Sequence, residues 1–246
     1  MLRVSWTNLL LLSWPLPPRD VRPAIPQDLE LDTLHGQAWV SIVVSRIAGA
    51  HPPWMFPLPW LSNFLALGVR ICVRKQAERG VFFLSIDTER AWAASFGRSW
   101  LHLPCFRARI QMTRDRTASL VASVRRHQGA ASAALTCEWR PAATMPQTGP
   151  YDLRHFLDAR HQVFTSHEGR LLSGDLWHSP FCWRDVEIRR LDSSMLEAAG
   201  LPSPETTPVA HEAEARAIEI WPMRLVNADA SDSALLDTVL APPPAG

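Results

Sequence analysis

Clusters of proline limit what the first third of the chain can fold into. One cluster spans residues 15–26 and a second spans residues 52–59. Proline lacks a backbone N–H and its ring clashes with the preceding turn, so long helices are excluded there. Between the clusters, Ala38–Ile47 is a β-branched run of strand length with apolar residues on both faces. It predicts a strand that is covered on both sides.

Later segments alternate with a period of two, which is typical of half-buried strands. In Gly68–Arg74, valine and isoleucine lie on one face and Arg70 lies on the other. In Phe106–Met112, apolar residues lie on one face and Arg107 and Arg109 lie on the other. Further strands are expected at Val81–Ile86, Ser119–Val124, Ala133–Trp139 and within Ala215–Leu225, with a hairpin formed by His161–Ser166 and Arg170–Trp177.

Three helices are expected. Thr88–Leu101 carries Trp92, Phe96 and Trp100 on one stripe, with Asp87 as the N-cap. Asp152–Arg160, which begins with Asp152 as its cap, and Ser194–Ala199 are shorter. Eight or nine strands without regular βαβ alternation predict an α+β domain over residues 1–226. Its largely antiparallel sheet is expected to curl or close, and residues 227–246 to form a flexible tail.

The charge and cysteine content exclude several classes of function. A formal net charge of +1 gives no reason to expect nucleic acid or a membrane surface as a partner. Four widely spaced cysteines without a CxxC pair argue against a zinc site and against a disulfide framework, and favour a cytoplasmic location. The apolar run at the start is too short for a membrane span, and Trp14-Pro15 replaces the small residues of a leader cleavage site. Oligomeric state is not indicated.

Several segments together resemble the YqjF-like family, domain of unknown function 2071. The matching stretches include Gly36-Gln37-Ala38-Trp39-Val40, Val69-Arg70, Gly80–Asp87, Leu103-Pro104, Phe156-Leu157 with Arg160, Gly169-Arg170-Leu171 and His178-Ser179-Pro180-Phe181. The family is grouped with the acetoacetate decarboxylase-like superfamily. The resemblance therefore implies a closed, cone-like β-sheet with helices outside and a cavity within, and it implies no activity.

One strand departs from the family pattern. The family commonly carries a Glu-x-Asn-Val-Arg-Thr-Tyr-Val type sequence where this chain has Ala66–Val73. The acidic residue and the asparagine are replaced by Ala66 and Gly68, and the tyrosine by Cys72. If these positions line the cavity, the cavity of this chain is more apolar than the pattern implies.

A Schiff-base mechanism, which the superfamily invites, needs a lysine with a depressed pKa. Lys75 is the only lysine, and it lies in a polar connector between two strands. A solvated lysine keeps its charge, so we expect no Schiff-base chemistry.

Other candidates for a ligand site are arginines and histidines. Arg70, Arg107 and Arg109 alternate with apolar residues, and any that points into a closed sheet must be paired or bind an anion. For Arg107 and Arg109 a solvated outer face is the alternative, and Arg160 has the alternative of capping a helix end. His102 and His178 are candidates for an acid/base role, with a structural or surface role as the alternative. Trp39, in the matched stretch Gly36-Gln37-Ala38-Trp39-Val40, is the remaining candidate for contact with a ligand. No metal or cofactor motif is present, so neither group is expected.

Three functions remain open. The first is binding of a small anionic or carbonyl-containing molecule in an internal cavity, contacted by Trp39, Arg70 and His178. The second is an enzyme acting on a small carboxylated compound without a Schiff base. The third is a protein interaction module built on the Trp/Pro-rich segment His51–Leu61.

Overall fold

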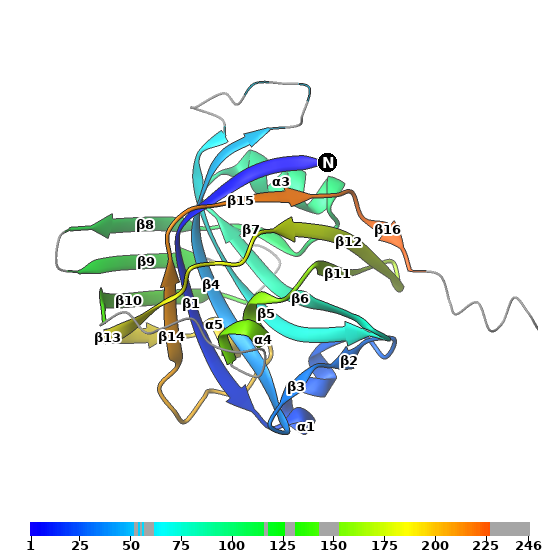
Figure 1. Cartoon of the computed structure of the whole chain (residues 1–246), viewed down its shortest axis with the longest axis horizontal. Coiled ribbons are helices and arrows are strands. Elements are labelled where there is room, and N and C mark those ends of the chain that lie inside the picture. Colours follow the sequence, from blue (N-terminus) through cyan, green and yellow to red (C-terminus); the bar gives the residue numbers. More distant parts are fainter. Residues whose placement is uncertain are drawn as a thin grey trace, which may run out of the picture.

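Seven strands close into a barrel (Figure 1). The structure is a computed structural model that describes residues 1–51, 54, 56, 62–115, 118–125, 131–142 and 153–226. Around the ring the strands are β1 (Leu2–Leu16), β4 (Gln37–His51), β5 (Phe64–Lys75), β6 (Glu78–Thr88), β11 (Gln162–His167), β12 (Arg170–His178) and β15 (Arg216–Ile220), which pairs back to β1. Only the β6–β11 pair of this ring is parallel. The predicted closed, largely antiparallel α+β fold is confirmed.

The strand β1 belongs to two sheets. Its first half pairs with β15, and its second half pairs with β14 (Val209–Ala213). From β14 a second sheet continues through β13 (Arg184–Ser193), β10 (Ala133–Pro141), β9 (Ser119–Arg125) and β8 (Arg109–Arg114). Figure 1 shows β8, β9, β10 and β13 side by side, to the left of the barrel.

Short elements complete the described chain. The helices are α1 (Pro18–Val21), a 3-10 turn at Arg22–Ala24, α3 (Ala91–Trp100), α4 (Leu153–Asp158) and α5 (Met195–Ala198). The short strands are β2 (Glu30–Leu31), β3 (Thr33–Leu34), β7 (Cys105–Arg107) and β16 (Arg224–Leu225). Among the described residues, no helix is long and apolar enough to cross a membrane.

The predicted two-sided burial of Ala38–Ile47 is confirmed, and it divides the interior into two cores. Val40, Ile42 and Val44 on β4 pack in the core between the barrel and the second sheet, which Leu135 and other β10 residues complete. Trp39, Val43 and Ile47 face the other way, into the interior of the barrel. Two-sided burial explains why this segment reads as a continuous apolar run.

Several boundaries differ from the sequence prediction. Asp87 does not cap a helix: it is a buried residue of β6 that pairs with Arg125, and α3 begins only after Arg90, which makes no side-chain cap. The expected strand Phe106–Met112 is split into β7 and β8 at Ala108, whose N–H donates to the Thr88 carbonyl. Both differences arise from contacts with residues distant in sequence, Arg125 for Asp87 and Thr88 for Ala108.

The hairpin of β11 and β12 is confirmed, with Glu168 and Gly169 both at positive φ in its turn. The short helix expected at Ser194–Ala199 is confirmed as α5, and Gly200 follows it at a φ of +80°. Asp152, the cap expected for α4, and the tail expected at residues 227–246 lie outside the described residues.

Candidate functional site

A pocket of about 720 Å³ lies at one end of the barrel. At this end, Figure 1 shows the start of β1 and the helix α3. Its walls come from β1, β4, β5, β6, β12, β15 and α3, together with residues that follow α3. Most of the lining is apolar, and its aromatic members are Trp6, Trp54, Phe64, Phe83, Trp92, Phe96 and Trp100. A pocket of this size and lining suits a small molecule with a large apolar surface.

The stripe predicted on the first helix forms one wall of this pocket. Trp92, Phe96 and Trp100 all line it, spaced at i, i+4 and i+8 along α3. The ring of Phe96 stacks on that of Trp100 with centroids 5.0 Å apart, and Trp92 meets Phe64 of β5 edge-on at 5.4 Å. Trp92 and Phe96 are also partly exposed, so the stripe extends from the pocket wall to the protein surface.

Small residues on β5 leave the pocket open. Ala66 and Gly68 point inward at alternate positions, and both line the pocket. A Cβ at Gly68 would lie 2.8 Å from the carbonyl oxygen of Ser85 and 3.3 Å from the ring of Phe83. Only glycine fits at this point without a shift of the neighbouring strand.

The polar groups of the pocket are few. Ser45 and Thr88 contribute hydroxyl groups, and His51 and Cys105 are its only titratable side chains among the described lining residues. Burial raises the pKa of the Cys105 thiol to about 12, so that sulfur stays protonated near neutral pH. The pocket therefore offers hydrogen bonds to a carbonyl or hydroxyl group and no fixed charge on a side chain.

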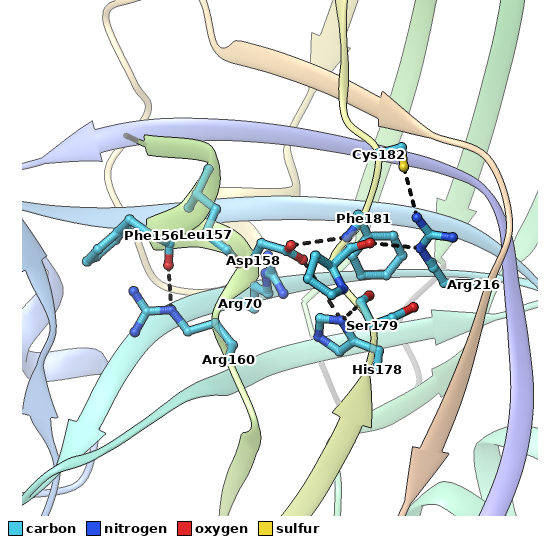
Figure 2. Close-up of polar contacts among 11 residues, drawn as sticks. Arg70, Phe156, Leu157, Asp158, Arg160, His178, Ser179, Phe181, Cys182 and Arg216 are labelled. Atoms are coloured by element: carbon cyan, nitrogen blue, oxygen red, sulfur yellow. Dashed lines mark hydrogen bonds and ion pairs between the residues drawn. The ribbon is translucent and has the colours of Figure 1, made fainter. Parts of the chain in front are cut away.

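A second, polar cluster occupies the interior of the barrel beyond Gly68 (Figure 2). The next inward position on β5 after Gly68 is Arg70, whose Nη2 donates to the carbonyl oxygen of Leu157 in α4 at 3.2 Å. Burial lowers the pKa of Arg70, with a smaller contribution in the same direction from Arg160, while Cys72 and Asp158 oppose the shift. Figure 2 shows the Arg70 side chain directed toward Asp158.

Asp158 and His178 form the titratable part of this cluster. Nδ1 of His178 lies 4.0 Å from Oδ1 of Asp158 and 3.1 Å from the Ser179 carbonyl oxygen, to which it donates, while Asp158 Oδ2 accepts the Phe181 N–H at 3.1 Å. Burial raises the pKa of Asp158 and lowers that of His178. Both shifts favour the uncharged forms, so His178 is a neutral imidazole near pH 7.

The structure brings together three of the seven candidate residues. Trp39 lies on β4 diagonally across from Arg70, since Val40 pairs with Ile71 and Ser41 with Arg70. Figure 2 shows Arg70 and His178 in the same cluster around Asp158, and the positive charge of Arg70 is the smallest of the causes that lower the pKa of His178. None of the three lines the apolar pocket.

The other four candidates have other partners or are exposed. Arg160 pairs with Asp32, and its Nε donates to the Phe156 carbonyl at 2.8 Å, which is the helix-capping role foreseen for it. Arg107 and Arg109 are exposed. His102 stacks on the exposed His167 with ring centroids 4.2 Å apart, at the end of α3.

Two carboxylates of this region were not anticipated from the sequence. Asp158 follows Phe156-Leu157 at the end of α4, and Asp32 follows a short strand. A signal for Asp158 was its position between the matched residues Leu157 and Arg160. Asp32 meets Arg160 only because β2 pairs with β5, a contact that no local pattern indicates.

The sequence pattern of the DUF2071 family, described as an uncharacterized conserved protein, matches residues 3–216. The chain belongs to the DUF2071 family. It is 27% identical over 225 residues to the uncharacterized protein YqjF of Bacillus subtilis strain 168, a match that covers 91% of this chain and 92% of YqjF.

Solved structures with the same fold extend the likeness beyond DUF2071. An acetoacetate decarboxylase-like enzyme from Sphingomonas wittichii RW1 is 13% identical, with a TM-score of 0.62, and the match covers 93% of this chain and 94% of that one. The acetoacetate decarboxylase of Legionella pneumophila is 12% identical, with a TM-score of 0.60 and coverage of 91% and 87%. The enduracididine biosynthesis enzyme MppR, solved with pyruvate, is 12% identical, with a TM-score of 0.63 and coverage of 92% and 90%. At these identities the likeness shows the fold alone.

Two departures of this DUF2071 chain from the family pattern fall in the pocket, whereas the third, Cys72, does not line it. Ala66 and Gly68, which stand where the pattern has a carboxylate and an amide, both line it. Lys75, by contrast, is the last residue of β5, next to a turn at Gln76 with a φ of +54°. It does not line the apolar pocket, so its amine is not placed to react with a molecule bound there.

Among the described residues of this DUF2071 chain, no group of three or more His, Cys, Asp or Glu side chains is arranged to hold a metal ion.

Proposed function

We propose that the chain binds a small, predominantly apolar molecule, carrying a carbonyl or hydroxyl group, in the pocket between α3 and the barrel strands. The observation that carries the proposal is the lining: aromatic and aliphatic side chains surround a space of about 720 Å³, and the hydroxyl groups of Ser45 and Thr88 are among the few polar groups. Hydrophobic burial would supply the affinity, and one or two hydrogen bonds would orient the ligand.

The geometry favours binding over the two alternatives. The pocket lining described above contains no carboxylate and no lysine, and the Cys105 thiol stays protonated, so His51 has no acidic partner there with which to form a catalytic pair. Trp54 and Phe56 are exposed, as an interaction module would require, but Trp54 also lines the pocket. Other residues of the segment His51–Leu61 lie outside the described part of the chain. A cytoplasmic location stays a prediction, supported by four cysteines that are all free.

A neutral fluorophore, N-phenylnaphthylamine, tests this proposal. We expect its fluorescence to rise saturably with the purified protein, and native mass spectrometry to detect any ligand retained from the expression host. Ala66→Phe places a phenyl ring in the pocket and should weaken fluorophore binding by about tenfold or more.

The matched control is Ala134→Phe, at an exposed position of β10 away from the pocket. It should leave fluorophore binding unchanged, and the melting temperature of each variant reports whether it folds. Equal binding by both variants, or no saturable binding by the wild type, would contradict the proposal.

A further inference from the structure

Arg70 is buried without the partners that the other buried arginines have. Three arginines are buried in the described part of the chain. Arg125 lies 3.1 Å from Asp87, and Arg160 pairs with Asp32. Arg70, only 8% exposed, has no carboxylate oxygen of the described residues within 4.0 Å of its guanidinium nitrogens.

The hydrogen bonds of Arg70 are equally incomplete. Nη2 donates to one neutral acceptor, the Leu157 carbonyl, and Nε is buried without an acceptor among the described residues. A guanidinium stays protonated in proteins and carries five N–H donors. Burying it with one neutral acceptor is strongly unfavourable unless a further anion or acceptor completes its shell.

A second unused donor faces the same interior as Arg70. The indole Nε1 of Trp39 is buried and has no acceptor among the described residues. In the β4–β5 pair, Trp39 stands diagonally to Arg70 and faces the same interior. Arg160 donates to the Phe156 carbonyl, next to the Leu157 carbonyl that accepts from Arg70, and its own charge is paired with Asp32. The unsatisfied N–H donors are therefore those of Arg70 and Trp39.

The neighbouring Asp158 limits the negative charge that a ligand bound at Arg70 can carry. Figure 2 shows Asp158 next to Arg70, and its Oδ1 has no hydrogen-bond partner among the described residues. A dianion such as phosphate would meet this carboxyl group at close range, whereas a carboxylate monoanion would meet less repulsion. The two parallel N–H groups of a guanidinium also match the two oxygens of a carboxylate.

We propose that the Arg70 guanidinium and the Trp39 indole N–H form a binding site for the carboxylate of a small organic acid. This site is distinct from the apolar pocket, because neither residue lines that pocket. It lies one inward-facing position beyond Gly68, with α4 and the segment around His178 beside it (Figure 2).

The indole N–H signals of the eleven tryptophans report directly on this site in a ¹H–¹⁵N correlation spectrum. The probe is sodium acetate, titrated at constant ionic strength against sodium chloride, and Trp39→Phe assigns the Trp39 signal. We expect acetate to move the Trp39 signal saturably and to leave that of Trp177, which is 55% exposed on β12, in place. The titration of the wild-type protein is enough to overturn the proposal, if acetate does not move the Trp39 signal or if chloride moves it equally.

Variants separate the anion site from general salt effects and from the pocket. Arg70→Gln should abolish the acetate response. Arg70→Lys should weaken it, because an ammonium group keeps the positive charge but lacks the two parallel N–H groups of a guanidinium. The control Arg109→Gln, at an exposed strand position, should respond as the wild type does. Persistence of the Trp39 shift in Arg70→Gln would also overturn the proposal.

A substitution that blocks the apolar pocket should leave binding at the carboxylate site unchanged. Ala66→Phe is expected to block the naphthylamine fluorophore and to leave the acetate response intact. Loss of the acetate response in Ala66→Phe would show that one continuous site binds both probes, and would contradict the separate carboxylate site.

Discussion

Asp87 on β6 and Arg125 on β9 form an ion pair that is almost closed off from solvent. Burial raises the pKa of Asp87 to about 6, against the attraction and hydrogen bonding of Arg125. Between pH of about 4 and about 6, the folded protein therefore holds a proton that the unfolded chain releases. The contribution of Asp87 to the free energy of unfolding is largest below this window and falls as the pH rises through it.

Asp87→Asn removes this titration while keeping the shape of the side chain. The free energy of unfolding of the variant, minus that of the wild type, should rise by up to about 3 kcal/mol as the pH is raised from about 4 to about 7. Urea unfolding at several pH values measures the difference. A difference that stays constant over this range would show that Asp87 is ionised in the folded protein throughout.

Single residues of the candidate site were predictable only where a local pattern exposes them. Alternation along β5 placed Arg70 opposite the apolar face, and the matched motifs indicated Trp39 and His178. Asp158 lies between the matched residues Leu157 and Arg160, but its role could not be predicted, because it depends on α4 packing across the interior of the barrel against the chain around Phe181. Arg107 and Arg109 show the same alternation as Arg70 yet lie exposed, so periodicity identifies a face and does not identify its surroundings.

The position of α3 over the pocket depends on a close contact between the helix and β7. A Cβ at Gly97 would lie 2.4 Å from the Cys105 sulfur. Nη1 of Arg98 also donates to the carbonyl oxygen of Cys105 at 2.6 Å, which holds the helix against the strand. Glycine is a poor helix former, so its presence inside α3 is explained by this close approach.

Gly97→Ala should therefore destabilise the protein by about 1–3 kcal/mol, although alanine alone would favour the helix. The double variant Gly97→Ala/Cys105→Ala removes the sulfur and should recover part of the loss. Thermal unfolding of both variants and of Cys105→Ala alone measures the coupling. A rise in melting temperature for Gly97→Ala would show that helix propensity outweighs the contact.

Elements with a clear periodicity were predicted from sequence, whereas β1, β13, β14 and the two-residue strands β2 and β3 were missed. The stripe of Trp92, Phe96 and Trp100 identified α3 because all three face one pocket. The missed strand β1 carries apolar residues on both faces, since it separates the barrel interior from the second core. Strand β13 is rich in charged residues and largely solvent-facing, and β14 is short, so neither shows strong alternation.

At the scale of the whole molecule, the barrel and the second sheet share one core. Leu10, Leu12 and Trp14 of β1 pack with Leu135 and Trp139 of β10 in the same apolar cluster, while the interior of the barrel forms the other cluster. Because β1 contributes to both clusters and pairs with β4, β14 and β15, neither sheet has a core that is independent of the other. We infer that the described part of the chain unfolds as one cooperative unit.

Two matched leucine substitutions test this cooperativity. Leu135→Ala empties space in the core between the sheets, and Leu176→Ala does so inside the barrel, each at a cost of about 2–5 kcal/mol. Far-ultraviolet circular dichroism and tryptophan fluorescence should give coincident unfolding curves for the wild type and for both variants, with the single midpoint lowered in each variant. If Leu135→Ala instead produced an early transition seen by only one probe, the second sheet would be a separate folding unit. The pocket could then survive its loss, because α3 and the pocket-lining strands all lie on the barrel side of β1.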